Sequence, residues 1–282
     1  PASPETRMGS CSSSAEQSPE WHNVMHILKD ADPQLVYDIL NSNVPGQKVK
    51  NFRAPSTTGH PTLFGAFGSR WGILMSQPKE FSPVCLSELG MAEEYLPEFR
   101  KRKARVVGLS CSSIEELKKR LEDIRYFTKM TRGAAFQPSF PIFSDENASI
   151  SASLGLIPIQ EALTTCPTTR SCEASASHTI KTNETFRKVF VIDPSRKLRV
   201  IMTYPMETGI NFNEILRVLD SLRLASKKAL STPANWGKGK VCFAADGGGV
   251  ELDKKRYTSS IVQVRCRVHD SLRGDILLFQ RS

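Results

Sequence analysis

The sequence predicts an α/β protein, in which a central sheet is covered by helices. Three short apolar runs, at residues 71–76, 106–110 and 189–192, have the composition of buried strands. Amphipathic segments with helical spacing lie between them. Alternating strands and helices are typical of layered α/β folds, in which each helix buries its apolar face against the sheet.

Two helices are expected between these strands. The first spans residues 84–102 and should be kinked or split by Pro97, because a proline removes a backbone hydrogen bond within a helix. The second spans residues 114–127, and Ser113 and Glu116 have the spacing of a capping box at its start. Its apolar face is formed by Leu117, Leu121 and Ile124.

The second half of this region predicts a hairpin followed by a helix. Residues 188–193 and 197–203 read as two strands, because Pro194-Ser195-Arg196 between them has the composition of a turn. A capped helix should then begin at Asn211. Before the first strand, a strand-like stretch through Phe52 leads to a glycine-rich turn around Gly65 and Gly68. This order of elements is the one expected of a thioredoxin-like fold, a central mixed sheet flanked by helices.

Three regions are expected along the chain. Residues 1–45 form an N-terminal extension, disordered where Ser, Pro and Glu dominate, with short helices after it. Residues 46–226 form the thioredoxin-like domain. Residues 227–282 form a small appended C-terminal domain.

Composition narrows the possible partners and the compartment. The 282 residues are 39% hydrophobic, and no apolar run is long enough to cross a bilayer, so stable membrane insertion is not expected. The net charge of +9 is spread along the chain, and its densest basic run, residues 100–105, falls at an expected helix end. A nucleic-acid partner is therefore not expected.

The seven cysteines are scattered, and no two have the Cys-x-x-Cys spacing of dithiol or zinc sites. Neither these cysteines nor the histidines predict a metal site. A reducing compartment fits best, and we expect a cytoplasmic protein. The chain begins with Pro rather than Met, so an upstream targeting peptide could direct it to an organelle instead.

Cys85 is the strongest candidate for a reactive residue. It follows an apolar strand and a short loop, and it is expected in the first turn of a helix. There the unpaired backbone N–H groups and the positive end of the helix dipole favour a thiolate. Because the thiolate is the nucleophilic form of cysteine, this position predicts a reactive thiol.

The motif Pro78-x-x-x-Ser82-x-x-Cys85 resembles the active-site motif of the peroxiredoxins. The surrounding block WGILMSQPKEFSPVCLSELG, residues 71–90, is similar to their one-cysteine branch. Two distal blocks, at residues 204–219 and 232–236, strengthen the resemblance, which spans about residues 46–236. It implies a thioredoxin-like peroxiredoxin domain and a divergent C-terminal dimerisation region.

The resemblance also implies a set of site residues. Cys85 takes the place of the peroxidatic cysteine, and Ser82 that of the hydroxyl residue that hydrogen-bonds to it. Pro78 matches the residue that shields the thiolate from water, and Arg187 matches the active-site arginine. Glu88 matches an acidic residue one turn after the cysteine, where it could either serve substrate binding or lie on the helix surface.

The activity implied is that of a thiol-dependent peroxidase. Cys85 would reduce hydrogen peroxide and organic or lipid hydroperoxides, becoming a sulfenic acid in antioxidant defence and redox homeostasis. Without a prosthetic cofactor, an external thiol such as glutathione or thioredoxin would recycle it. The resemblance further implies a homodimer.

Two alternatives remain open. Gln77 stands where the one-cysteine branch usually has His, and the C-terminal sequence diverges, so the chain could be a redox sensor or a holdase that oxidises without turnover. Cys242, or the pair Cys166 and Cys172 in a long polar loop at residues 161–184, could instead resolve oxidised Cys85 as in a two-cysteine peroxidase.

Overall fold

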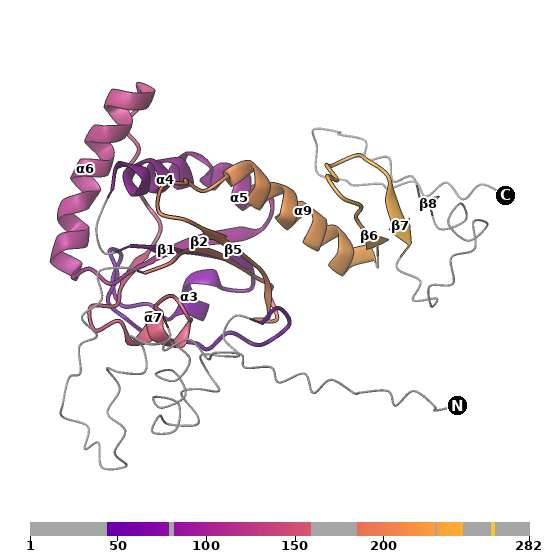
Figure 1. Cartoon of the computed structure of the whole chain (residues 1–282), viewed down its shortest axis with the longest axis horizontal. Coiled ribbons are helices and arrows are strands. Elements are labelled where there is room, and N and C mark those ends of the chain that lie inside the picture. Colours follow the sequence, from indigo (N-terminus) through magenta and orange to yellow (C-terminus); the bar gives the residue numbers. More distant parts are fainter. Residues whose placement is uncertain (1–43, 79–81, 159–184, 229, 245–260, 263–282) are drawn as a thin grey trace, which may run out of the picture.

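A five-stranded mixed sheet forms the centre of the protein (Figure 1). The structure, a computed structural model, describes residues 44–78, 82–158, 185–228, 230–244 and 261–262. The strands in spatial order are β3 (Ile142–Ser144), β2 (Ala104–Ser110), β1 (Trp71–Gln77), β4 (Arg187–Ile192) and β5 (Leu198–Tyr204). The predicted strands and hairpin are thus present, and β3 is a strand that the sequence did not predict.

The register of the central strand decides what lies at its end. β1 pairs in parallel with β2, so that Gln77 lies opposite Ser110. It pairs antiparallel with β4, where Met75 lies opposite Val189. Because β1 and β4 run in opposite directions, the end of β1 lies beside the start of β4 at Arg187.

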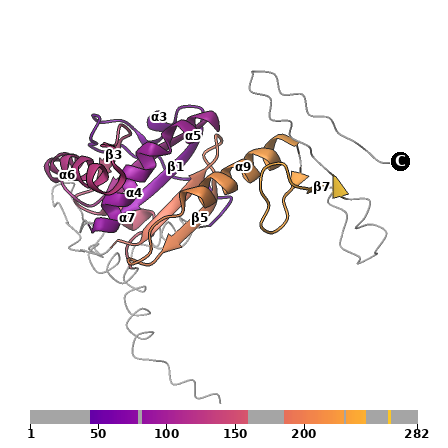
Figure 2. The ribbon, with the colours of Figure 1, turned by 90° about the horizontal axis from the view of Figure 1, so that it is seen from above.

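Helices cover both faces of the sheet. One face packs against α4 (Pro83–Glu94), α5 (Leu96–Lys101), α6 (Ile114–Arg132) and α9 (Phe212–Lys228). The other face packs against the short helices α3 (Leu63–Phe67) and α7 (Ser149–Ser153) (Figures 1 and 2). Successive side chains along a strand point to opposite faces, so Ile73 and Met75 enter one core while Leu74 enters the other. The predicted layered α/β, thioredoxin-like architecture is confirmed.

Proline and capping residues in the sequence predicted most of the helix ends correctly. Pro97 splits the expected helix into α4 and α5, since it occupies the first turn of α5, where a missing N–H is tolerated. Ser113 and Glu116 form the capping box of α6, and the side chain of Asn211 accepts the backbone N–H of Glu214 at the start of α9. α6 continues to Arg132, beyond the expected end at residue 127, and stops at Gly133 in the left-handed region.

The segment before β1 differs from the prediction. The glycine-rich stretch forms α3, whose start is capped by the side chain of Thr62 and whose end is Gly68 at φ +58°. The stretch through Phe52 forms no strand of the sheet; isolated bridges join Arg53 to Thr62 and Ser56 to Phe143. A side-chain cap outweighed the low helix propensity of the glycine within α3.

Beyond the main sheet, α9 leads into a second, small sheet. Its strands are β6 (Leu230–Ser231), β7 (Cys242–Ala244) and β8 (Ile261–Val262). Leu230, Trp236 and Cys242 form a separate small core with Leu224 of α9. The helix therefore runs across the expected domain boundary at residue 226 and carries the C-terminal strands on its end (Figure 1).

Several expectations fall on residues that the structure does not describe. They include nearly all of the N-terminal extension, the polar loop with Cys166 and Cys172, and most of the C-terminal sequence after Ala244. In the described chain, no helix is both long and apolar enough to span a membrane.

The contact between α4 and α6 allows a test of the packing. A Cβ on Gly90 would lie 2.2 Å from Cγ2 of Thr128, which is fully buried. We expect Gly90→Ala to lower the free energy of unfolding by up to about 2 kcal/mol, because overpacking at about 1–3 kcal/mol exceeds the roughly 1 kcal/mol gained in helix propensity. Urea denaturation of the full chain measures this.

Thr128→Ser in the Gly90→Ala background is the matched rescue. It removes the clashing methyl group and keeps the hydroxyl, which donates to the carbonyl of Ile124 and accepts the N–H of Phe136. The double variant should recover most of the lost stability. Unchanged stability of Gly90→Ala alone would show that the helices separate at little cost.

Candidate active site

The start of α4 presents the thiol of Cys85. Ser82 is the N-cap and Pro83 begins the helix, whose first turn contains Cys85. The Ser82 hydroxyl accepts the backbone N–H of Cys85 at 3.4 Å and lies 3.5 Å from its Sγ, to which it donates. The thiol is fully buried. One hydroxyl thus both caps the helix and contacts the sulfur.

Arg187, the first residue of β4, brings a positive charge to this sulfur. Its Nη2 donates to Sγ of Cys85 at 3.4 Å. Its Nη1 donates to three backbone carbonyls of the segment after β5, those of Pro205, Met206 and Thr208, at 3.1, 2.5 and 3.1 Å. The side chain is fully buried, so these contacts replace its hydration and fix its orientation.

Glu88 completes the neutralisation of this buried charge. Its Oε1 forms an ion pair with Nε of Arg187 at 3.1 Å and accepts the backbone N–H of Ile210 at 3.0 Å. The side chains are 2% and 0% exposed, which excludes the alternative that Glu88 lies on the helix surface. Burial raises the pKa of the Glu88 carboxyl above its usual value, while the charge of Arg187 opposes that rise.

Gln77, the last residue of β1, adds a further contact to this network. Its Nε2 donates to Oε2 of Glu88 at 3.4 Å, and the residue is fully buried. Its Oε1 has no hydrogen-bond partner within the described part of the chain. An unpaired buried amide oxygen costs about 1–3 kcal/mol, which is a typical penalty at a functional site rather than in a core.

The structure thus brings together four of the five residues named from the sequence: Cys85, Ser82, Arg187 and Glu88. Pro78 is buried directly after β1, and the residues between it and Ser82 lie outside the described chain. Sequence reasoning did not identify the carbonyl groups after β5 or the N–H of Ile210 as partners. These are backbone groups, and a residue pattern carries no signal for them.

The arrangement suits one kind of chemistry. A soft nucleophile lies at a helix N-terminus, with a guanidinium and a hydroxyl donating to it at 3.4 and 3.5 Å. These donors stabilise negative charge on sulfur and on an oxygen bound beside it. No cluster of three or more metal-ligating side chains occurs among the described residues. The site therefore fits nucleophilic attack by sulfur on an electrophilic oxygen.

The other described cysteines lie elsewhere. Cys111 and Cys242 are, like Cys85, buried thiols. Cys242 begins β7 in the small sheet, and its Sγ contacts the carbonyl of Lys240 at 3.7 Å. In Figure 1, α4 and β7 lie in different parts of the molecule, on opposite sides of α9. The fold therefore places Cys242 in a different sheet from the Cys85 site.

Sequence comparison identifies relatives with known names. Residues 45–201 match the model of the AhpC/TSA family. The chain is 37% identical over 205 residues to a 1-Cys peroxiredoxin of Dirofilaria immitis, covering 70% of this chain and 81% of the relative. It is 35% identical over 196 residues to peroxiredoxin-6 of Mus musculus, covering 69% and 80% respectively.

Solved structures agree with these relatives. A mutant of the peroxiredoxin 6 of Arenicola marina superimposes with a TM-score of 0.60 at 31% identity, covering 82% of this chain and 94% of that one. A yeast mitochondrial 1-Cys peroxiredoxin superimposes with a TM-score of 0.60 at 29% identity, covering 83% and 99%. With the family model matching more than half of its length, this chain belongs to the AhpC/TSA family and is a peroxiredoxin of the one-cysteine branch.

Proposed function

We propose that this peroxiredoxin reduces hydroperoxides with Cys85 as the peroxidatic residue. The observation that carries the assignment is the contact of the Cys85 thiol with Arg187 and Ser82 at the start of α4. The activity itself, a thiol-dependent peroxidase in antioxidant defence, is that of its one-cysteine relatives.

In the first step, the Cys85 thiolate attacks the distal oxygen of the peroxide. An S–O bond forms, the O–O bond breaks, and the leaving oxygen takes a proton to depart as water or an alcohol. Cysteine is oxidised to sulfenic acid while the peroxide is reduced. The guanidinium of Arg187 stabilises the negative charge that moves from sulfur to the leaving oxygen, and the Ser82 hydroxyl can donate to the same oxygen.

In the second step, an external thiol returns Cys85 to its reduced form. The thiol attacks the sulfenic sulfur and releases water, and a second thiol then releases Cys85 from the mixed disulfide. We propose glutathione or thioredoxin as this reductant, since the yeast mitochondrial neighbour resolves its thiol via glutathione and thioredoxin systems. Pro78, buried directly after β1, would limit the access of water to the thiolate.

We further propose that the protein works in a reducing compartment, the cytoplasm or an organelle. The seven cysteines are scattered and no two have the Cys-x-x-Cys spacing, a usage that supports a reducing environment. A yeast relative, 33% identical over 197 residues, is named as mitochondrial.

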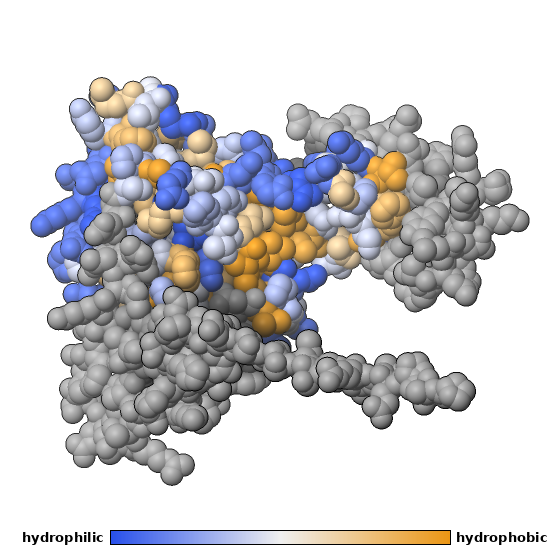
Figure 3. All heavy atoms as spheres, in the orientation of Figure 1, coloured by the Kyte–Doolittle hydropathy of each residue, from blue (hydrophilic) through white to orange (hydrophobic). Residues whose placement is uncertain are grey.

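A homodimer is the partner arrangement that the sheet supports. β5 is the end strand, and residues 46–47 bond to its first residue, Leu198. Across the rest of β5, the described chain supplies no further strand partner. Figure 3 shows hydrophobic side chains gathered below α9, on the β5 side of the sheet. Half-buried Val200, Met202 and Tyr204 of this strand pack against the core that includes α9 and leave part of their apolar surface uncovered. An end strand with unpaired backbone groups and such side chains favours pairing with a second copy.

Mutation of two cysteines separates a one-cysteine from a two-cysteine cycle. We expect Cys85→Ser to abolish peroxide turnover, because serine is not ionised at neutral pH and cannot replace the thiolate. Cys242→Ser should leave the first oxidation unchanged, since Cys242 lies in the other sheet. Rapid mixing with one equivalent of hydrogen peroxide, dimedone trapping and peptide mass analysis measures both.

A disulfide joining Cys85 to another cysteine after peroxide treatment would instead make the protein a two-cysteine enzyme. Oxidation of Cys85 without turnover by any physiological thiol would favour the sensor or holdase alternative. Fast labelling at Cys85 with sustained turnover supports the proposed cycle.

Glu88 is proposed as a positioning residue that acts through Arg187. Glu88→Gln preserves the size of the side chain and an acceptor for the N–H of Ile210, but it removes the charge beside Arg187. We expect the rate of Cys85 oxidation at pH 7 to fall about tenfold, because loss of the 3.1 Å ion pair leaves the guanidinium less firmly oriented, and tenfold corresponds to about 1.4 kcal/mol.

The pH profile distinguishes positioning from a general loss of structure. The Glu88 carboxyl, whose pKa is raised by burial, is ionised above that pKa and neutral below it. As the pH falls through this value, the native protein should approach Glu88→Gln, so the ratio of their oxidation rates should shrink towards one. Stopped-flow measurement of Trp fluorescence gives the ratio, and a ratio that stays constant with pH would contradict the proposed role.

Two methionine variants test the dimer. Met202→Lys places a charge on the partly uncovered apolar face of β5 and should convert the dimer to a monomer, as measured by light scattering after gel filtration. Met130→Lys, the same substitution at a 68% exposed position of α6, should leave the mass unchanged. A native protein that is already monomeric would overturn the proposal.

A further inference from the structure

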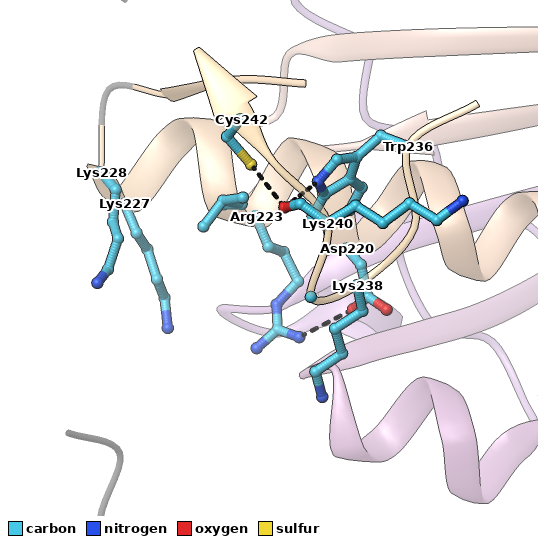
Figure 4. Close-up of a pocket in the computed structure, with 10 residues that line it drawn as sticks. Asp220, Arg223, Lys227, Lys228, Trp236, Lys238, Lys240 and Cys242 are labelled. Carbon is cyan, nitrogen blue, oxygen red and sulfur yellow. Dashed lines mark hydrogen bonds and ion pairs between the residues drawn. The ribbon is translucent and has the colours of Figure 1, made fainter. Parts of the chain in front are cut away.

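Two cavities meet on the C-terminal half of α9, away from Cys85. The first has a volume of about 210 Å³ and lies between α9 and the loop that leads to β7 (Figure 4). Its walls include the apolar groups of Leu224, Trp236 and Cys242. The indole Nε1 of Trp236 donates to the carbonyl of Lys240 at 3.2 Å, and this contact holds the loop in place.

Four cationic side chains gather on one side of the first cavity. Figure 4 shows the charged ends of Arg223, Lys227, Lys228 and Lys238 directed to the same side of it, whereas Lys240 extends away from them. Asp220, the one carboxylate in the lining, already pairs with Arg102 at 3.0 Å and lies 3.9 Å from Arg223. Within the described chain, the three lysines of this group have no carboxylate partner.

The second cavity, of about 350 Å³, shares Arg223 and Lys227 with the first. Its lining is mixed: Trp71 and Pro194 contribute apolar surface. Its polar groups include the hydroxyls of Ser69, Ser195 and Ser226 and the further cations Arg70 and Lys103. Its carboxylate, Asp193, pairs with Arg199 at 3.3 Å. Cations that are distant in the sequence are therefore gathered by the fold around two adjoining hollows.

The two hollows differ in the chemistry that they accept. The first offers apolar walls with a cationic rim, and the second offers hydroxyl and cationic donors. Ligand sites in proteins commonly measure 300–1,000 Å³ and combine apolar walls with a few polar groups. A ligand suited to both hollows has an apolar end, for which an aromatic ring is one fit beside Trp236, and a multiply charged anionic end, which Arg and Lys bind through charge-assisted hydrogen bonds.

We propose that this surface binds a nucleoside polyphosphate. The base occupies the cavity beside Leu224 and Trp236, and the phosphates lie on Arg223 and Lys227 and reach the hydroxyl groups of the second cavity. The site is separate from the Cys85 pocket, so the proposal stands independently of the peroxidase assignment. None of its residues belongs to the proposed catalytic machinery.

Calorimetric titration of the full-length protein with ATP tests the proposal. We expect saturable binding at one site per chain, which weakens as salt is added because screening reduces the attraction of the phosphates. Pyrophosphate and adenosine, titrated separately, should each bind at least about tenfold more weakly than ATP, since each fills one of the two hollows. Pyrophosphate binding as tight as that of ATP would overturn the assignment of the base to the apolar cavity.

Charge reversal at the shared position locates the site. Lys227 is exposed, so Lys227→Glu should fold normally, and it should weaken ATP binding by at least about tenfold. Lys118→Glu makes the same change in net charge at an exposed position of α6 and should leave ATP binding unchanged. Equal weakening by both variants, or no saturable ATP binding to the native protein, would overturn the proposal.

The peroxidase assay separates this proposal from the proposed function. Lys227→Glu should oxidise Cys85 and turn over peroxide at the native rate. Loss of ATP binding with full peroxidase activity is the expected result, whereas an inactive native enzyme that still binds ATP would contradict only the peroxidase assignment.

Discussion

The buried ion pair between Arg187 and Glu88 is the interaction on which the site depends. A guanidinium removed from water is costly unless its charge and its N–H groups are all satisfied. Here three backbone carbonyls and the sulfur of Cys85 accept hydrogen bonds from its Nη atoms. The carboxylate of Glu88 balances its charge through an ion pair with Nε, which has no hydrogen-bond partner among the described residues. Removing one partner of such a pair typically lowers the free energy of unfolding by about 3–5 kcal/mol. The pair therefore contributes to the stability of the fold as well as to the orientation of the thiol.

The sheet topology explains why these groups meet. β1 ends where β4 begins, because the two strands are antiparallel neighbours. The chain leaving β1 enters α4, so the first turn of that helix, with Cys85, is brought next to Arg187 at the start of β4. The segment after β5 then closes the site from the other side with its carbonyls and the N–H of Ile210. Four separate stretches of chain are fixed by two strand pairings.

The two halves of α9 have different surroundings. Its first half packs Phe212, Ile215 and Leu219 into the core above the sheet. Its last turns carry Arg223 and Lys227 past the edge of that core, where they face two cavities rather than the sheet. Amphipathic spacing explains the buried half of the helix. The basic residues at its end line a cavity only because the loop before β7 and the strand itself pack beside them.

The sequence by itself determined the layered α/β fold, the main strands and the split of the first long helix at Pro97. These follow from local causes: apolar runs, capping residues and the missing N–H of proline. It also named Cys85, Ser82, Arg187 and Glu88, through their resemblance to a family motif. Only the tertiary structure decided that Glu88 is buried against Arg187, that backbone groups after β5 hold both, and that scattered cations converge on α9. Such contacts join residues distant in the sequence, and the energy of a buried charge depends on all its neighbours at once, which no local pattern specifies.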